Sequence, residues 1–169
     1  MENINKFLEI LNHNIGNNKN VTYDFFSTFS RFEYSLKHCG YAVNDYYGNA
    51  MADWNQFAFE HNKKFDLTLL SENNELKDSI KYLYENPPRI LKVYNNKLKW
   101  ENRQHYKIHN LKNLLNIIKA TRNNLFHGSK RIVIFKEPTR DFTLIKSSLI
   151  ILDECLNYNA NLKTKFIEI

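Results

Sequence analysis

An arginine, two asparagines and a histidine lie close together in one short stretch of this sequence. They are Arg122, Asn123, Asn124 and His127, and in a helix they would fall within about two turns. An imidazole exchanges protons near neutral pH, and a guanidinium can stabilise charge that develops on a phosphorus centre without a metal ion. The two amides can orient a phosphate or fix the imidazole. The stretch therefore holds the groups that phosphate chemistry needs.

The directions of these four side chains depend on the helix that contains them. Apolar residues at helical spacing predict a helix that begins after a cap at Asn110 and ends just before Gly128. At 100° per residue, Ile118, Arg122 and Leu125 fall on nearly one line, so Arg122 interrupts an apolar stripe.

Asn123 and His127 share a different face of that helix, which points away from most of the stripe. His127 stands at the helix C-terminus, where the dipole favours the imidazolium form. A structural role is the alternative, because a histidine before a glycine is a common helix ending and an arginine on a stripe often extends to solvent. On physical grounds alone both interpretations stay open.

A second charge, Glu33, interrupts the apolar stripe of a helix predicted from Thr22 to about His38. A carboxylate on an apolar face must find a partner, since burying it alone is costly. Glu33 and Arg122 are therefore expected to form a cross-helix pair that leaves part of the guanidinium available for a phosphate. The alternative is that Glu33 lies at the stripe edge, in solvent.

The rest of the chain also has mostly helical spacing, and no repeat or domain boundary interrupts it. A small β-hairpin is predicted between 90 and 100, because Asn95-Asn96 tolerates the positive φ angles of a tight turn. A Tyr-rich connection is expected at 41–48, and a basic loop with a possible short strand at 129–140. The other predicted helices are 2–13, Ala50 to about His61, Ser71 to just before Pro87-Pro88, and a final helix capped by Asp141.

Composition sets the limits on fold and partners. The 169 residues, 43% of them hydrophobic and 14% aromatic, predict one all-α domain over 1–169 with a real core. The formal net charge of +6 favours an anionic partner, nucleic acid before membrane surface, but composition alone favours the alternative of a solvated basic surface. Cys39 and Cys155 have no metal-type spacing and indicate free thiols of a reducing compartment.

Membrane and metal sites are not expected from the sequence. No apolar run approaches the length of about 20 residues that spans a membrane, and the N-terminus lacks the pattern of a secretion signal, so a soluble cytoplasmic protein is predicted. His105 and His109 have the spacing of a zinc pair, but no nearby residues complete a tetrahedral set. We therefore expect no metal and no cofactor.

Two stretches resemble a known family. Arg122 to His127 matches the R-x(4–6)-H signature of HEPN domains (higher eukaryotes and prokaryotes nucleotide-binding), including the polar residue that follows the arginine. The segment 31–37 is similar to the R-F-E-x-x-L-K segment of bacterial HEPN proteins, and Pro87-Pro88 and Trp100 resemble that group more weakly. The resemblance extends in order from about residue 22 to residue 158.

This resemblance implies a four- to five-helix bundle, with the hairpin near 90–100 as an insertion, that forms a homodimer and joins two R-x4-H motifs in one cleft. It implies metal-independent endoribonuclease activity of a toxin–antitoxin or antiphage type, giving 2′,3′-cyclic phosphate and 5′-OH ends, with a possible antitoxin or other protein partner. Arg122 and His127 would be catalytic, with Asn123 in support and Glu33 as the acidic partner.

Further phosphate contacts are expected from Asn124, Lys130 and Arg131, and also from Lys136 and Arg140, unless that basic loop is merely solvated. Two alternatives remain. One is a catalytically inactive HEPN-like module that binds nucleotide or RNA or dimerises. The other is a helical DNA-binding module, which charge alone favours.

Overall fold

The computed structural model describes residues 19–69, 72–103, 106–126 and 138–168, and this part of the chain is mostly helical. Six helices are described there, and two small antiparallel hairpins accompany them. The helices are α2 (Lys19–His38), α3 (Trp54–Leu69), α4 (Asn74–Glu85), α5 (Leu111–Phe126), α6 (Pro138–Asn157) and α7 (Ala160–Ile167). The strands are β1 (Ala42–Asn44), β2 (Ala50–Ala52), β3 (Ile90–Tyr94) and β4 (Lys97–Glu101). A helical bundle is thus confirmed, and the helix expected at 2–13 lies outside the described residues.

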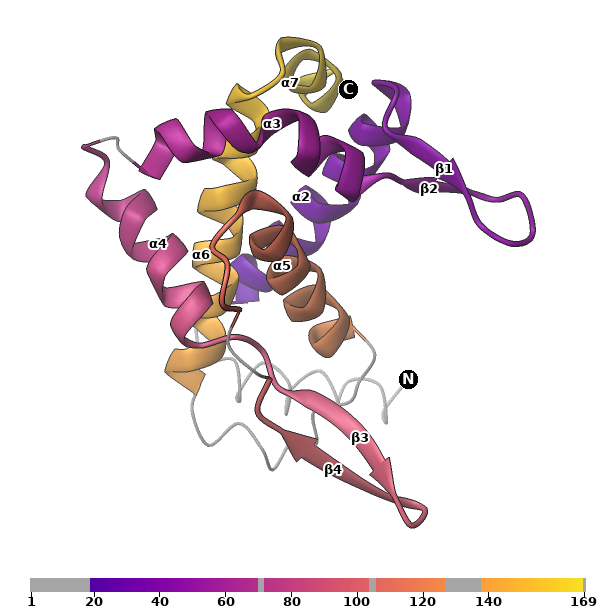
Figure 1. Cartoon of the computed structure of the whole chain (residues 1–169), viewed down its shortest axis with the longest axis vertical. Coiled ribbons are helices and arrows are strands. Elements are labelled where there is room, and N and C mark those ends of the chain that lie inside the picture. The colour runs from indigo at the N-terminus through magenta and orange to yellow at the C-terminus, as the bar shows by residue number, and fades with distance from the viewer. Residues whose placement is uncertain (1–18, 70–71, 104–105, 127–137, 169) are drawn as a thin grey trace.

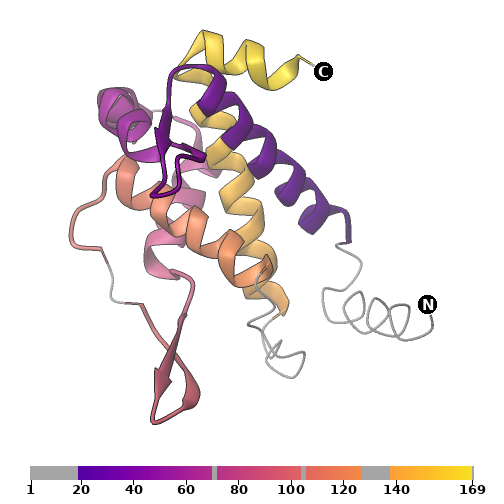
Figure 2. The same ribbon diagram turned by 90° about the vertical axis from the view of Figure 1, so that its right-hand side faces the viewer.

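The helices form a bundle around one apolar core (Figure 1). Helix α6 packs against α2 and α4, while α3 packs against α5. Helix α7 lies across one end of the bundle and contacts both α2 and α6 (Figure 2). The largest fully buried side chains are Phe25, Phe32, Phe57, Phe65, Leu36, Leu83, Leu111, Leu114, Leu115, Ile117, Ile118 and Leu152.

Several helix ends agree with the capping residues expected from the sequence. Helix α2 is followed by Gly40 at φ +89°, a left-handed conformation that glycine adopts without steric cost. Helix α5 begins after Asn110, whose Oδ1 accepts from the Asn113 amide at 2.9 Å. Helix α4 ends before Pro87, as expected, but it begins after a cap at Asn73.

The hairpin expected near residues 90–100 is confirmed. Strands β3 and β4 pair antiparallel in a register that sets Tyr94 opposite Lys97. The two turn residues, Asn95 and Asn96, have φ angles of 46° and 60°, which is the mirror-image turn that matches the strand twist. The hairpin extends away from the bundle near the C-terminal end of α5 (Figure 1).

A second hairpin replaces the start of the helix expected from Ala50. Residues 50–52 form β2, which pairs with β1 so that Val43 lies opposite Met51. Helix α3 begins only at Trp54, because the Asp53 carboxylate accepts from the amides of Asn55 and Gln56 at 3.1 and 2.9 Å and caps the first turn there. The helix also continues to Leu69 instead of ending near His61.

The C-terminal part also differs from expectation. Helix α6 begins at Pro138, a residue suited to the first helical position, so Asp141 lies in the first turn and is not the cap. An additional helix, α7, follows, and the Arg31 guanidinium donates to the carbonyls of Lys165 and Phe166 at its end. The possible strand at 132–135 lies outside the described residues. None of the helices described is both long and apolar enough to cross a membrane.

Candidate functional site

An open cleft of about 470 Å³ lies between α2, α5 and the β1–β2 hairpin. Helices α2 and α5 provide its charged walls, and β2 with the start of α3 closes another side. Of the four residues that the sequence predicts to be catalytic, three line this cleft: Glu33, Arg122 and Asn123. The residues that line it are Phe29, Glu33, Lys37, Val43, Ala50, Met51, Ala52, Asp53, Trp54, Asn55, Lys119, Arg122 and Asn123.

Arg122 is half-buried in the last turns of α5. Its guanidinium carbon lies 5.5 Å from the centroid of the Phe29 ring, within the range of a cation–π contact. Its Nη1 donates to Asn123 Oδ1 at 3.2 Å. The aromatic ring and the amide therefore hold the planar donor group at the cleft wall, where it can meet a phosphate oxygen.

Glu33 lines the same cleft from α2. Its Oε1 accepts from the indole Nε1 of Trp54 at 3.3 Å. The Trp54 ring is stacked on Phe29 and Phe32, with centroids 5.3 and 5.2 Å away, so the donor is held by buried aromatic packing. Glu33 and Arg122 both line this cleft. The ion pair between them stays a prediction.

Lys119 is a cleft residue that the sequence analysis missed. It lies three positions before Arg122 and therefore on the same side of α5, which is the signal that could have identified it. Burial lowers the pKa of its ammonium group, whereas the carboxylates of Glu33 and Asp53 act in the opposite direction. The two carboxylates are thus near enough to influence Lys119 electrostatically.

The side chain of Asn124, which was expected to contact phosphate, binds a backbone carbonyl outside the cleft. Its Nδ2 donates to the carbonyl oxygen of Arg89 at 2.7 Å, which joins the end of α5 to the base of the β3–β4 hairpin. It is not among the residues that line the cleft. A phosphate contact by Asn124 remains a prediction, and His127, Lys130 and Arg131 lie outside the described residues.

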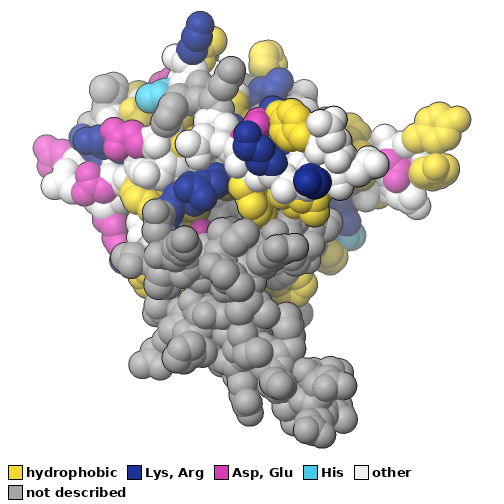
Figure 3. Space-filling model, turned by 90° about the horizontal axis from the view of Figure 1, so that it is seen from below, with side chains coloured by type: hydrophobic (Ala, Val, Ile, Leu, Met, Phe, Trp, Pro, Cys, Tyr) yellow, Lys and Arg dark blue, Asp and Glu magenta, His cyan; other side chains and the backbone are white. Residues whose placement is uncertain are grey.

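The charge distribution in the cleft suits an anion held beside an acidic group. Lys37, Lys119 and Arg122 contribute positive charge, and Glu33 and Asp53 contribute negative charge. On the face seen from below, Lys and Arg side chains gather in the middle of the described surface, while most Asp and Glu side chains lie toward one edge (Figure 3). Such a cleft can fix a phosphate at the guanidinium and place a polar or cationic neighbour against the carboxylates.

A metal centre finds no support in the described part of the chain. No group of three or more His, Cys, Asp or Glu side chains that could hold a metal ion occurs there. His109, one member of the pair with zinc spacing, stacks its ring on Tyr84 at 4.0 Å between centroids, and His105 lies outside the described residues.

Comparisons with protein-family models, curated proteins and solved structures give no match to the chain.

Proposed function

We propose that this protein is an endoribonuclease of the HEPN type that needs no metal ion, with Arg122 and His127 as its catalytic pair. The observation that carries this proposal is the setting of Arg122. Its guanidinium lies on the Phe29 ring and beside Asn123, in a cleft that also contains Glu33 and Lys119. A guanidinium held in this way is suited to a phosphodiester.

The proposed reaction is an internal phosphoryl transfer in RNA. The ribose 2′-oxygen bonds to the adjacent phosphorus, the bond from phosphorus to the 5′-oxygen breaks, and a 2′,3′-cyclic phosphate and a 5′-OH end result. His127 moves the proton that leaves the 2′-OH or the one that reaches the 5′-oxygen. Arg122 stabilises the negative charge on the five-coordinate phosphorus, and Glu33 keeps the guanidinium in place.

The proposal includes a homodimer, because each chain supplies a single histidine in this motif while the reaction has two proton transfers. Two copies that place their R-x4-H motifs in a shared cleft would provide one group for each transfer. This bundle would then be an HEPN-like domain, and a toxin or antiphage role with a neutralising protein partner would follow from that likeness.

The test is cleavage of RNA in the presence of EDTA by the wild type and by the single variants Arg122→Ala and His127→Ala. We expect a loss of at least about 100-fold for each variant, since each removes a group that acts in the transition state. Lys63→Ala is the matched control, because it removes an exposed positive charge on α3, away from the cleft lining.

Three outcomes are decisive. Cleavage that is lost in both variants and kept in Lys63→Ala supports the proposal. Cleavage that persists in Arg122→Ala and His127→Ala contradicts it. RNA binding without turnover by the wild type, across structured and single-stranded RNAs, would instead assign the chain to the inactive binding or dimerisation module.

A further inference from the structure

A second pocket, of about 200 Å³, lies at the base of the β3–β4 hairpin and is lined by three arginines. They come from different parts of the fold: Arg89 precedes β3, Arg103 follows β4, and Arg140 lies in the first turn of α6. Each arginine contributes a guanidinium, a planar group of N–H donors whose geometry suits phosphate oxygens. Of the seven lining residues, one is acidic, Glu85.

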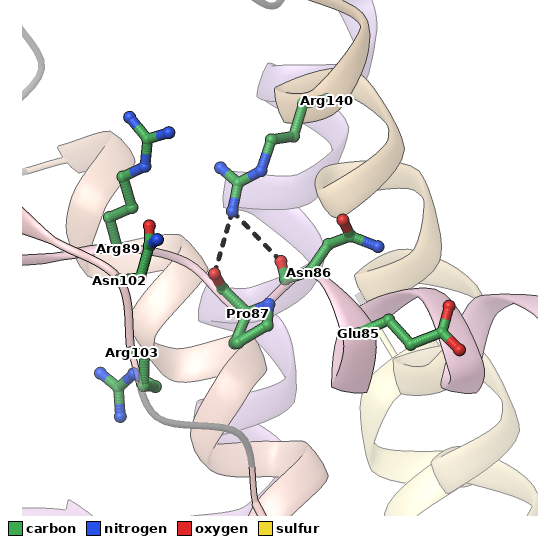
Figure 4. Close-up of a pocket in the computed structure, with 7 residues that line it drawn as sticks. All are labelled: Glu85, Asn86, Pro87, Arg89, Asn102, Arg103 and Arg140. Carbon is green, nitrogen blue, oxygen red and sulfur yellow. Dashed lines mark hydrogen bonds between the residues drawn. The ribbon is translucent and has the colours of Figure 1, made fainter.

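The carboxylate of Glu85 does not neutralise these arginines. Figure 4 shows its side chain directed away from the Arg140 guanidinium. Arg140 itself lies 4.0 Å from an Asp141 oxygen, which is the limit of an ion pair. The pocket therefore has an excess of positive charge, and the positive end of the α6 dipole adds to it.

Arg140 is held in a fixed position for binding. Its Nη2 donates to the carbonyl oxygens of Pro87 at 2.9 Å and Asn86 at 3.3 Å (Figure 4). These bonds fix the plane of the guanidinium at the end of α4. The sequence predicts a phosphate contact by Arg140. This geometry puts that contact in the pocket at the base of the β3–β4 hairpin, separate from the cleft that contains Arg122.

Arg103 is the third arginine that lines this pocket. Its Nη1 donates to the Tyr106 hydroxyl at 3.3 Å, while its Nε is buried and has no hydrogen-bond partner among the residues the structure describes. The buried Nε is closed to groups that enter the pocket, so Arg103 can act on an anion there through the positive charge and the remaining donors of its guanidinium.

The volume limits what the pocket can hold. A pocket of 200 Å³ corresponds to roughly six or seven water molecules. It is smaller than the roughly 300–1,000 Å³ sites that enclose whole small molecules. A single phosphate group with a few waters fits these dimensions.

We propose that this pocket binds a phosphomonoester group, the dianionic phosphate at the end of a nucleotide or of a nucleic-acid strand. A dianion complements the excess positive charge of this pocket better than the single charge of a phosphodiester does. The site does not depend on RNA cleavage. It lies close to the candidate catalytic stretch, since the Arg89 carbonyl accepts the hydrogen bond from Asn124 at the end of α5.

The experiment is calorimetric titration of the full chain with four ligands: inorganic phosphate, a nucleoside 5′-monophosphate, and a single-stranded deoxyoligonucleotide with and without a 5′-phosphate. The deoxy strand has no 2′-OH, so the proposed cleavage cannot interfere. We expect saturable binding of phosphate and of the nucleotide, and tighter binding of the phosphorylated strand than of its 5′-hydroxyl twin.

The variants locate the site. Arg89→Gln and Arg103→Gln should each weaken the binding of these phosphomonoesters about tenfold, and Lys63→Gln should leave it unchanged. Arg89→Gln is the cleanest probe, because the described hydrogen bond of Arg89 uses its backbone oxygen. Arg140→Gln should also weaken binding, but it removes the bonds to Asn86 and Pro87 as well.

Some results would overturn the proposal. These are an absence of saturable phosphate binding up to about 10 mM, equal binding of the two oligonucleotides, or unchanged affinity in both Arg89→Gln and Arg103→Gln. Failure of RNA cleavage would leave these titrations unaffected, so the pocket and the proposed nuclease are tested separately.

Discussion

At the scale of single residues, the cleft shows how aromatic packing can position charged groups. Phe29 contacts the Arg122 guanidinium on one side and the Trp54 ring on another, while Trp54 donates to Glu33. The two oppositely charged side chains are thus linked through buried rings. Replacing either ring should disturb the geometry of the charges as well as the core.

Trp54→Phe tests this linkage. The substitution keeps an aromatic ring in the stack but removes the indole donor to Glu33, so we expect a loss of about 1 kcal/mol in the free energy of unfolding. Urea denaturation measures it. Trp100→Phe, at a half-buried position in β4, is the control and should change stability by less than about 0.5 kcal/mol. Equal midpoints for the two variants would contradict the role given to the Trp54–Glu33 bond.

At the scale of elements, Arg31 fastens α7 to the bundle. Its Nε and Nη2 donate to the carbonyls of Phe166 and Lys165 at 2.9 and 3.0 Å, where the helix leaves its last carbonyls without intrahelical donors. Its guanidinium carbon also lies 4.7 Å from the Tyr34 ring centroid. Arg31, which belongs to the segment that resembles HEPN proteins, thus has a structural function in this chain.

Arg31→Lys should destabilise the protein by about 1–2 kcal/mol, because an ammonium group cannot supply two donors in the same planar arrangement. Amide hydrogen exchange should also speed up in α7 more than in α5. Arg89→Lys, at an exposed position, is the control, with an expected change under about 0.5 kcal/mol. An unchanged exchange rate in α7 would show that other contacts hold this helix.

The elements also show which features sequence patterns can predict. The Asn95-Asn96 pair identified the β3–β4 hairpin, because its conformation depends on two adjacent residues. The β1–β2 hairpin was missed, since Ala50 to Ala52 continue the apolar spacing of the following helix and only the Asp53 cap separates them. The contact between Trp54 and Glu33 joins positions 21 residues apart, and local spacing gives no information about such a pair.

At the scale of the whole molecule, the bundle buries polar groups as well as apolar ones. His61 is 8% exposed, and its Nε2 lies 3.1 Å from the Tyr41 hydroxyl. Burial lowers the pKa of its imidazole, with Lys64 acting in the same direction and Glu60 against it. The folded state therefore prefers the neutral ring.

This preference predicts a dependence of stability on pH. Below the ordinary histidine pKa of about 6.5, the unfolded chain binds a proton at His61 before the folded chain does. The free energy of unfolding should therefore fall as the pH decreases from about 7.5 to 5.5, and urea titrations across that range measure the slope. His61→Gln should reduce the slope, whereas His38→Gln, at an exposed position, should not. The same slope in both variants would contradict the assignment.

The chemistry of the reaction products shows whether the Arg122 cleft is that of a metal-independent ribonuclease, as proposed. The substrate is an RNA oligonucleotide containing the preferred cleavage position, incubated with the wild-type protein in EDTA beside a twin with one 2′-deoxy sugar at that position. We predict 2′,3′-cyclic phosphate and 5′-OH ends from the RNA, and no cleavage at the deoxy position of its twin. Cleavage at the deoxy position, or products with 3′-OH and 5′-phosphate ends, would rule out this reaction for the Arg122 cleft.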